Sequence, residues 1–403
     1  MIIKEFLQWT VNSDTKSRVM AVRALCEAYI SGHFTSEEMK AAEGSMALLL
    51  EDLSPAVRKE MATVLAQSVN VPTMIINALA QDQIEVSAPI LAFSPLLSDN
   101  SLVDLIATGG FSQQFIIAKR DYLSASVCAA LVEVGDKEAV LALLDNPNAH
   151  IARLSISRLA ERFGYYGPIR SQLLERCDLP SDTRHKLVEE LSNTFANSPL
   201  VGALMGKDRL VNVTKDACFH ATISLAETTQ GDDMLALVEH LRISGKLTPA
   251  FLMHVLTIGN VDFFATIIEK LSGKSISRIR AILADGHSSV VNALYVSAGL
   301  DGEICPAFVS ATLLWRKASS SNHHMTGDQI TEYLMEEYYD ELHKDSAIAE
   351  LLMMLEKIQF AQRRKMAKQF ALSLTSQVSE VAHVPQALPA PEVTQDPQES
   401  EAA

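Results

Sequence analysis

Two short segments of this chain have the residue types of a catalytic or phosphate-binding motif. The segment GALMGKD, at Gly202–Asp208, has two glycines and a lysine, but the glycine spacing is one residue short of a phosphate-binding loop. Asp208 also stands where such a loop needs Ser or Thr to hold magnesium. The segment Gly286–Ser289 lacks the second glycine of a nucleophile elbow, and no strand is predicted before it. Both segments are better explained as connections between helices.

Histidines are the next residues that could do chemistry. The eleven histidines give no HExxH motif and no HxxxH pair with a nearby carboxylate at ligand spacing. His323 and His324, with Asp328, could bind a metal ion adventitiously, but a solvated loop explains them better. His220 and His254 lie on apolar stretches and are predicted to be core or groove residues. We therefore predict no catalytic residue, no metal ligand and no cofactor, and a protein that is not an enzyme.

Three arginines on one predicted helix are the candidate partner-binding residues. Arg153, Arg158 and Arg162 lie on the stretch His150–Phe163, which has helical periodicity. Together they would form a basic ridge that a protein partner could contact. The alternative is a solvated helix face with ordinary ion pairs.

The stretch Leu48–Phe93 shows which elements position these residues. Ser54 followed by Pro55 is typical of a helix start, because proline at the first helical position loses no hydrogen bond. Val57 then begins an apolar stripe at helical spacing, and comparable anchors follow at Val86, Phe115 and Ile151. A weak period of roughly 30 residues is typical of helix-pair repeats. The alternative is an irregular helical domain whose similar helix lengths create the spacing.

One of these helices resembles the second helix of a HEAT repeat. The residues that carry the resemblance are VRKEMATVLA, together with Asp52 ahead of the helix and Arg58 inside it. In HEAT repeats such a pair often bridges neighbouring units. The next unit keeps an aspartate, Asp82, but has no matching arginine, so we do not expect a regular ladder of bridges.

The amino-acid composition limits which folds and which cellular compartments are compatible with this chain. The chain has 403 residues, of which 48% are hydrophobic, and its low glycine and proline content favours an all-α fold. A net charge of −15 argues against general nucleic-acid binding. Five scattered cysteines with no CxxC are typical of reduced, mostly buried thiols. The N-terminus has no apolar core of a signal peptide, and no stretch is long enough to span a membrane, so we expect a cytoplasmic protein.

Along the chain, the predicted domains follow composition and periodicity. Residues 247–318 have short periodic stretches with tight connections: Thr248 with Pro249 predicts one helix start, and Ser288–Ser297 is predicted to be another helix. Ala196–Lys207 is predicted to be a flexible joint, and Gln329–His343 a helix. Residues 346–374 are predicted to form a long helix, and the tail, which has four prolines and no Lys or Arg, cannot bury enough apolar surface to order itself. The predicted divisions are an N-terminal helical cap (1–47), HEAT-like repeats (48–195), a second repeat block (207–318), C-terminal helices (329–375) and a disordered acidic tail (376–403).

The second block also resembles a known family. The stretch LTPAFLMHVLTIGNVDFFATIIEKLSGKSISRIRAILADG, with NALYVSAGL and PAF after it, is similar to the C-terminal part of an uncharacterised alphaproteobacterial family of HEAT-like helical proteins, a domain of unknown function. EVSAPILAFSPLLSD and LVEVGDKEAVLALLDNPNAHI resemble its repeat half. The resemblance spans roughly residues 45–315. It implies a bacterial cytoplasmic setting and an α-solenoid, and it assigns no site residue.

We therefore predict an all-α, HEAT-like α-solenoid with a long C-terminal helix and a disordered tail. The expected function is a non-catalytic scaffold or adaptor for an unknown protein partner, because extended concave surfaces are what solenoids offer. Two alternatives remain: a regulatory signalling module gated by its C-terminal helix and tail, and a nucleic-acid enzyme of the HEAT-like DNA-glycosylase type. For the long C-terminal helix, packing on the solenoid end is one alternative. The other is a dimerisation or partner helix that uses Met353, Met354, Leu355 and Ile358.

Overall fold

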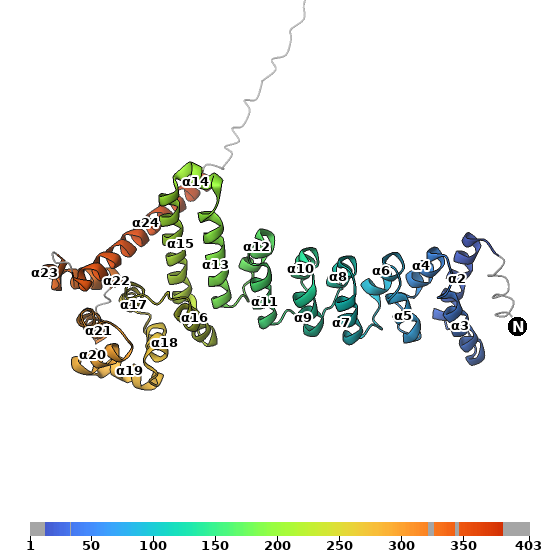
Figure 1. Cartoon of the computed structure of the whole chain (residues 1–403), viewed down its shortest axis with the longest axis horizontal. Helices are drawn as coiled ribbons and strands as arrows, with labels where there is room; N and C mark the ends of the chain where they lie inside the picture. Colours follow the sequence, from blue (N-terminus) through green and yellow to red (C-terminus); the bar gives the residue numbers. More distant parts are fainter. Residues whose placement is uncertain (1–12, 33, 321–325, 343–345, 382–403) are drawn as a thin grey trace, which may run out of the picture. The chain divides into compact units, whose positions relative to one another are not determined.

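The computed structural model of the chain describes residues 13–32, 34–320, 326–342 and 346–381. Within these ranges the protein is all-α: it has 23 helices and no strand, with one isolated bridge between Leu123 and Ala149. The helices pack sequentially in adjacent pairs (Figure 1). The predicted fold class is confirmed at this level. The predicted tail falls mostly outside the described residues, except that 376–381 belong to the last helix.

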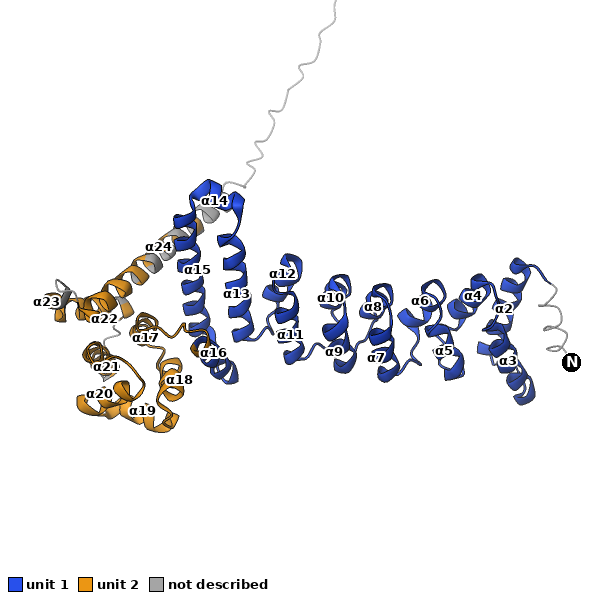
Figure 2. Ribbon diagram, in the orientation of Figure 1, with its two compact units in different colours: residues 1–241 blue, residues 242–403 orange. Residues whose placement is uncertain are grey.

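The chain divides into two compact units, residues 1–241 and 242–403 (Figure 2). The last helix of the first unit, α16, runs two residues past this division. The helices are α2 (Thr15–Ile30), α3 (Ser36–Leu49), α4 (Pro55–Leu65), α5 (Thr73–Ala80), α6 (Ile84–Phe93), α7 (Asp99–Thr108), α8 (Phe111–Ala118), α9 (Ala125–Val134), α10 (Lys137–Leu144), α11 (Arg153–Phe163), α12 (Gly167–Glu175), α13 (Ser181–Ala196), α14 (Pro199–Met205), α15 (Lys207–Thr228) and α16 (Asp232–Ile243).

Alternate helices of the first unit contact one another. Helices α2, α4, α6, α8, α10 and α12 each contact the next in this series, and α7, α9, α11, α13 and α15 form a second series. One apolar core runs between the two series from Val22 to Leu187. Of the predicted anchors, Val57 and Val86 are fully buried, whereas Phe115 and Ile151 are partly buried and pack against the same core. Three of the anchors therefore lie on the core-facing side of α4, α6 and α8, whereas Ile151 lies in the connection between α10 and α11.

The second unit has a core of aromatic side chains. Its helices are α17 (Pro249–Thr257), α18 (Val261–Ser272), α19 (Ile276–Asp285), α20 (Ser288–Ser297), α21 (Cys305–Ser320), α22 (Gly327–Glu337), α23 (Tyr339–Leu342) and α24 (Ala347–Val381). Tyr295 is fully buried, its ring lies against Phe264 and Phe308, and its hydroxyl lies 2.6 Å from the Thr312 hydroxyl. Because the Thr312 hydroxyl donates to the Phe308 carbonyl at 2.8 Å, the Tyr295 O–H donates to Thr312, which satisfies the buried phenol group.

The long C-terminal helix α24 packs within the second unit. Its first half contacts α17 and α22 and buries Leu352, Leu355 and Ile358. Met353 and Met354, which the dimer alternative also uses, are about half exposed. Packing of this helix on its own chain accounts for the apolar stripe, and homodimerisation stays a prediction.

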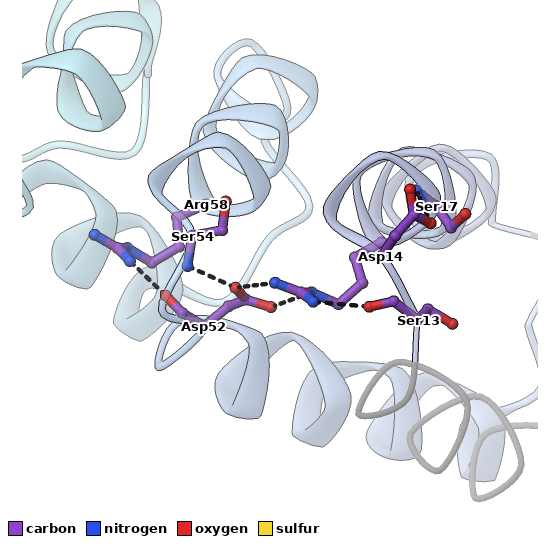
Figure 3. A network of polar contacts seen from close by, with 7 residues as sticks. Ser13, Asp14, Ser17, Asp52, Ser54 and Arg58 are labelled. Carbon is purple, nitrogen blue, oxygen red and sulfur yellow. Dashed lines mark hydrogen bonds and ion pairs between the residues drawn. The ribbon is translucent and has the colours of Figure 1, made fainter.

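A network of hydrogen bonds between acidic and basic side chains links the first helices of the first unit. The Arg18 guanidinium donates to both carboxylate oxygens of Asp52, which also accepts from the Ser54 N–H (Figure 3). Arg58 donates to the Asp52 carbonyl and, at 2.5 and 3.0 Å, to the carboxylate of Asp82, which lies in the turn between α5 and α6. Asp52 thus bridges back to Arg18 on α2, and Arg58 bridges forward to Asp82 after α5. Both residues link neighbouring elements, as the resemblance to a HEAT repeat implied, but each side chain does so with a different partner.

The bond between Arg58 and Asp82 predicts a pH-dependent stability. Hydrogen bonding from Arg58 lowers the pKa of the Asp82 carboxyl in the folded state. The pair therefore contributes its full stabilisation at pH values above the ordinary Asp pKa, which is near 3.9. This stabilisation is lost as the pH falls through the lowered pKa of the folded state. Asp82→Asn is expected to cost about 1–3 kcal/mol at pH 7. Chemical denaturation from pH 7 to pH 3 should show the difference from the natural chain closing at the acid end. Asp104→Asn, at an exposed position on α7, is the control, and a cost for Asp82→Asn that is unchanged at pH 3 contradicts the assignment.

Arginines also cap helix ends from neighbouring elements. Arg120 donates to the carbonyls of Leu91 and Ser94 at 2.6 and 2.7 Å, at the end of α6. In the same way Arg162 reaches the end of α9, and Arg316 the end of α19. The last carbonyls of a helix lack intrahelical donors, and a cation there also opposes the helix dipole favourably. These arginines therefore fix one helix pair to the next in both units.

The predicted joint at Ala196–Lys207 contains a helix. Pro199–Met205 forms α14, and Ser198 accepts a hydrogen bond from the Val201 N–H at its start. Gly206, with a φ of 82°, separates α14 from α15. The GALMGKD segment is therefore the end of one helix and the start of another, in agreement with the prediction that it connects helices. This stretch lies inside the first unit.

Candidate functional site

Each of the three arginines of α11 has a partner within the chain. Arg153 forms an ion pair with Asp233, and Arg158 donates to Glu133 at 3.0 Å and to Glu161 at 3.3 Å. Arg162 donates to the Val132 and Gly135 carbonyls. The Arg153 and Arg158 side chains are about half exposed, whereas Arg162 is occupied in holding the end of α9. The partner-binding ridge stays a prediction, and it is confined to the first two arginines.

A groove crosses the surface of the first unit between α4, α6 and α8. It consists of two hollows of about 630 and 470 Å³ that share Gln67, Ala92 and Phe93. Phe93 is 57% exposed although it is a large apolar side chain at the end of α6. The larger hollow has an apolar floor that includes Val64, Ala88, Pro89 and Ile116, and Lys59 and Glu85 also line it.

The smaller hollow adds charge to this groove. Asp99, Asp121 and the exposed ring of Tyr122 line it. Arg120 also lines it, but its guanidinium is bound to the two carbonyls at the end of α6, and burial lowers its pKa from the ordinary value. The groove therefore combines an apolar hollow, with the opposite charges of Lys59 and Glu85 among its lining residues, and a second hollow with two aspartates.

A second cluster lies deeper in the first unit, where α13, α15 and α16 meet. His185, from the first turns of α13, is fully buried, and Glu189 follows one turn later on the same face. His240, from α16, completes the group. The ligand atoms of these three residues lie within 4.8 Å of one another: His185 Nδ1 is 3.0 Å from His240 Nε2 and 3.6 Å from Glu189 Oε2, which is 3.9 Å from His240 Nε2.

Thr222 on α15 determines how His185 is protonated. The Thr222 hydroxyl donates to the Cys218 carbonyl at 2.9 Å, so its oxygen must accept the hydrogen bond that joins it to His185 Nε2 at 2.9 Å. Nε2 of His185 therefore carries the proton. Its Nδ1 therefore has the lone pair and accepts the hydrogen bond from His240 Nε2 at 3.0 Å, and Glu189 Oε2 lies 3.6 Å from the same nitrogen.

The sequence alone did not reveal this cluster. The search for metal ligands used histidine pairs at HExxH and HxxxH spacing, whereas this group combines His185 and Glu189, four residues apart, with a histidine 55 residues further on. The spacing of His185 and Glu189 on one helix face was a signal, but nothing local indicates His240. Of the other histidines singled out, His254 is buried in the core and His220 is half-buried, while His323 and His324 lie outside the described residues.

Buried thiols give no second reactive centre. Burial raises the pKa of Cys26 to about 12 and that of Cys128 to about 11, so both remain protonated at neutral pH. Cys305 is buried as well, while Cys177 is exposed and Cys218 is partly exposed. All five cysteines are free thiols, as predicted.

Comparison with known proteins places the chain in a family. Residues 86–329, more than half of the chain, match the model of a family described as uncharacterised proteins conserved in bacteria, DUF2336. The chain belongs to this family. The resemblance found in the sequence is thus confirmed at the level of a bacterial family of unknown function. No curated protein and no solved structure matches the chain.

The DUF2336 segment covers α6 and the elements that follow it as far as the start of α22. It therefore contains Phe93, the arginines of α11 and the whole cluster around His185. Asp52 and Arg58 lie before it. In the described part of the chain, no helix has both the length and the apolar character to cross a membrane.

Proposed function

We propose that this DUF2336 protein is a non-catalytic binding platform, in which helix pairs form a HEAT-like α-solenoid and the groove around Phe93 receives a segment of a partner protein. The observation that carries the proposal is the pair of adjoining hollows that share the exposed Phe93. An exposed aromatic side chain set between an apolar hollow and carboxylates is typical of a recognition surface.

The solenoid part of the proposal rests on the regular packing of the first unit. Alternate helices contact in two series, and arginines from one pair cap the helix ends of the pair before it. Stacked pairs of this kind leave one row of helices exposed along the array, and such rows are the surfaces that repeat proteins use for binding.

The lining of the groove indicates the chemistry of the partner. The apolar hollow suits an aliphatic or aromatic side chain, and Asp99 and Asp121 suit a lysine or arginine nearby. Pro89 lies inside α6 and has no N–H to give to the Glu85 carbonyl, so the groove wall also loses one helical hydrogen bond. The net charge of −15 favours a basic segment over an acidic one. We therefore propose a cytoplasmic protein partner with an apolar anchor beside a basic residue.

Peptide selection tests this proposal. Random peptides displayed on phage are selected against the full-length chain, and synthetic versions of those enriched are titrated by calorimetry. We expect enriched sequences to combine an apolar anchor with Lys or Arg. Phe93→Asp should weaken their binding by about tenfold or more, as the loss of a central aromatic contact does.

Phe111→Asp is the matched control, because Phe111 is 70% exposed on α8 and lines neither hollow. It should leave affinity unchanged. Enrichment of no common pattern, or equal losses for Phe93→Asp and Phe111→Asp, speaks against the groove. If the loss instead follows Arg153→Glu combined with Arg158→Glu, the binding surface is α11.

A further inference from the structure

The cluster of His185, Glu189 and His240 has the composition and geometry of a metal site. We propose that these three residues bind one divalent transition-metal ion of the zinc class through His185 Nδ1, His240 Nε2 and a Glu189 carboxylate oxygen. The ion would join α13 to α16 at the end of the first unit. This inference is independent of the proposed groove, which lies on other helices.

The distances among the three ligand atoms are those of a tetrahedral site. Zinc binds histidine nitrogen and carboxylate oxygen at about 2.0–2.2 Å, so two ligand atoms in tetrahedral geometry are about 3.3–3.5 Å apart. The observed separations of 3.0, 3.6 and 3.9 Å bracket that value. A small shift of side chains in a partly exposed position, such as Glu189 or His240, is enough to equalise them.

The hydrogen bond from His185 to Thr222 prepares the first ligand. Metal-binding histidines usually donate their second ring nitrogen to an oxygen acceptor, which fixes the tautomer and the ring plane. His185 Nε2 donates to Thr222 Oγ1, which is itself held by the Cys218 carbonyl. The Nδ1 lone pair of His185 therefore points into the cluster, where it accepts from His240 Nε2. An ion would take the place of that proton once His240 carries its own proton on Nδ1, which frees both facing nitrogens as ligands.

Ligand type selects the class of metal. Two imidazoles with one carboxylate favour zinc and neighbouring transition metals over Ca²⁺ and Mg²⁺, which prefer all-oxygen sites. Two neutral histidines and one carboxylate carry a charge of −1, which a divalent ion converts to +1. Three protein ligands leave the fourth tetrahedral position to solvent. His185 and His240 are 55 residues apart, so a bound ion would close a long stretch of chain.

Metal titration of the full-length chain tests the site. The protein is prepared without a histidine tag, treated with chelator, and checked by circular dichroism before titration with Co²⁺ and then Zn²⁺. We expect one equivalent of Co²⁺ with the visible absorption of a tetrahedral site, displacement by Zn²⁺, and a higher thermal midpoint with Zn²⁺ than with chelator. Thr222→Val, which removes the acceptor for His185, should weaken binding by roughly 10- to 100-fold.

Loss of a direct ligand should cost more than that. Glu189→Gln and His240→Gln both change partly exposed side chains, so the fold should persist, and binding should weaken by more than about 100-fold. Glu190→Gln changes the neighbouring partly exposed carboxylate on the same helix and should have no effect. The double substitution of His323 and His324 by alanine removes the other histidine pair that could bind metal and should also have none.

Three results would overturn the site. The first is no stoichiometric uptake of Co²⁺ or Zn²⁺ by the natural chain. The second is uptake that survives both Glu189→Gln and His240→Gln, and the third is uptake lost with His323 and His324. In each case the cluster is a hydrogen-bonded histidine pair with a nearby carboxylate and no ion.

Discussion

Gly259→Ala is expected to destabilise the second unit by about 2–5 kcal/mol, the largest effect of any single substitution considered for this chain. Gly259 follows α17 with a φ of 80°, a conformation that costs an L side chain about 1–2 kcal/mol. A Cβ at this position would also lie 1.9 Å from Cζ2 of Trp315, so the indole ring on α21 must move. Forcing an extra carbon against packed side chains typically costs about 1–3 kcal/mol more.

Urea denaturation followed by tryptophan fluorescence measures this loss. The chain has two tryptophans, so in a Trp9→Phe background the signal reports on Trp315 and hence on the second unit. Gly273→Ala is the control, because Gly273 also has a positive φ of 67° but no atom lies within 4 Å of its added Cβ. It should show the conformational cost alone, and Gly259→Ala combined with Trp315→Leu should recover part of the loss. Equal costs at the two glycines would mean that the contact with Trp315 contributes nothing.

Helix boundaries were the part of this fold that the sequence predicts best. Helix α20 runs from Ser288 to Ser297 as expected, and Thr248 with Pro249 begins α17, where the Thr248 hydroxyl accepts from the Phe251 N–H. Caps and glycine stops act within four or five residues, so the signal and its structural effect lie in the same short stretch. Ser198 followed by Pro199 is the same kind of helix start, and it begins α14. We predicted a joint in this stretch because that signal was not used.

Other boundaries had no such local mark. The predicted helix Gln329–His343 is broken at Tyr338 into α22 and α23, although no glycine or proline stands there. The Tyr338 hydroxyl lies 3.2 Å from that of Ser310 on α21, and burial raises the pKa of Tyr338. Packing against a distant helix accompanies this break, and a scan of neighbouring residues does not detect such packing.

The candidate sites depend on contacts that no spacing in the sequence shows. His185 meets His240 across 55 residues, and Arg120 meets the Leu91 carbonyl across 29. The arginines of α11 show what periodicity can and cannot predict. Helical periodicity placed Arg153, Arg158 and Arg162 on one helix, as the structure confirms. Periodicity could not tell that Arg162 turns to the end of α9 while Arg158 pairs on the surface.

Arg316→Met should cost about 2–3 kcal/mol, because it removes the arginine that holds the end of α19. The guanidinium donates to the carbonyls of Ile282, Leu283 and Gly286 at 2.6–2.7 Å. Ile282 also accepts from the Gly286 N–H, so the loss falls mainly on the other two carbonyls. Methionine keeps the apolar stem of the side chain, which isolates the effect of the missing donors.

Arg280→Met is the matched test of this assignment, since Arg280 lies on α19 itself and forms an exposed ion pair with Asp262 at 2.7 Å. Exposed pairs of this kind contribute about 0–1 kcal/mol, so the two arginines should separate clearly in urea denaturation of the Trp9→Phe chain. A larger loss for Arg316→Met than for Arg280→Met would mean that the stabilisation comes from hydrogen bonds to the carbonyls at the end of α19, and not from the positive charge of an arginine. Indistinguishable losses would instead mean that water replaces the arginine at the end of α19, and the same conclusion would then extend to Arg120 and Arg162, which make the corresponding bonds in the first unit.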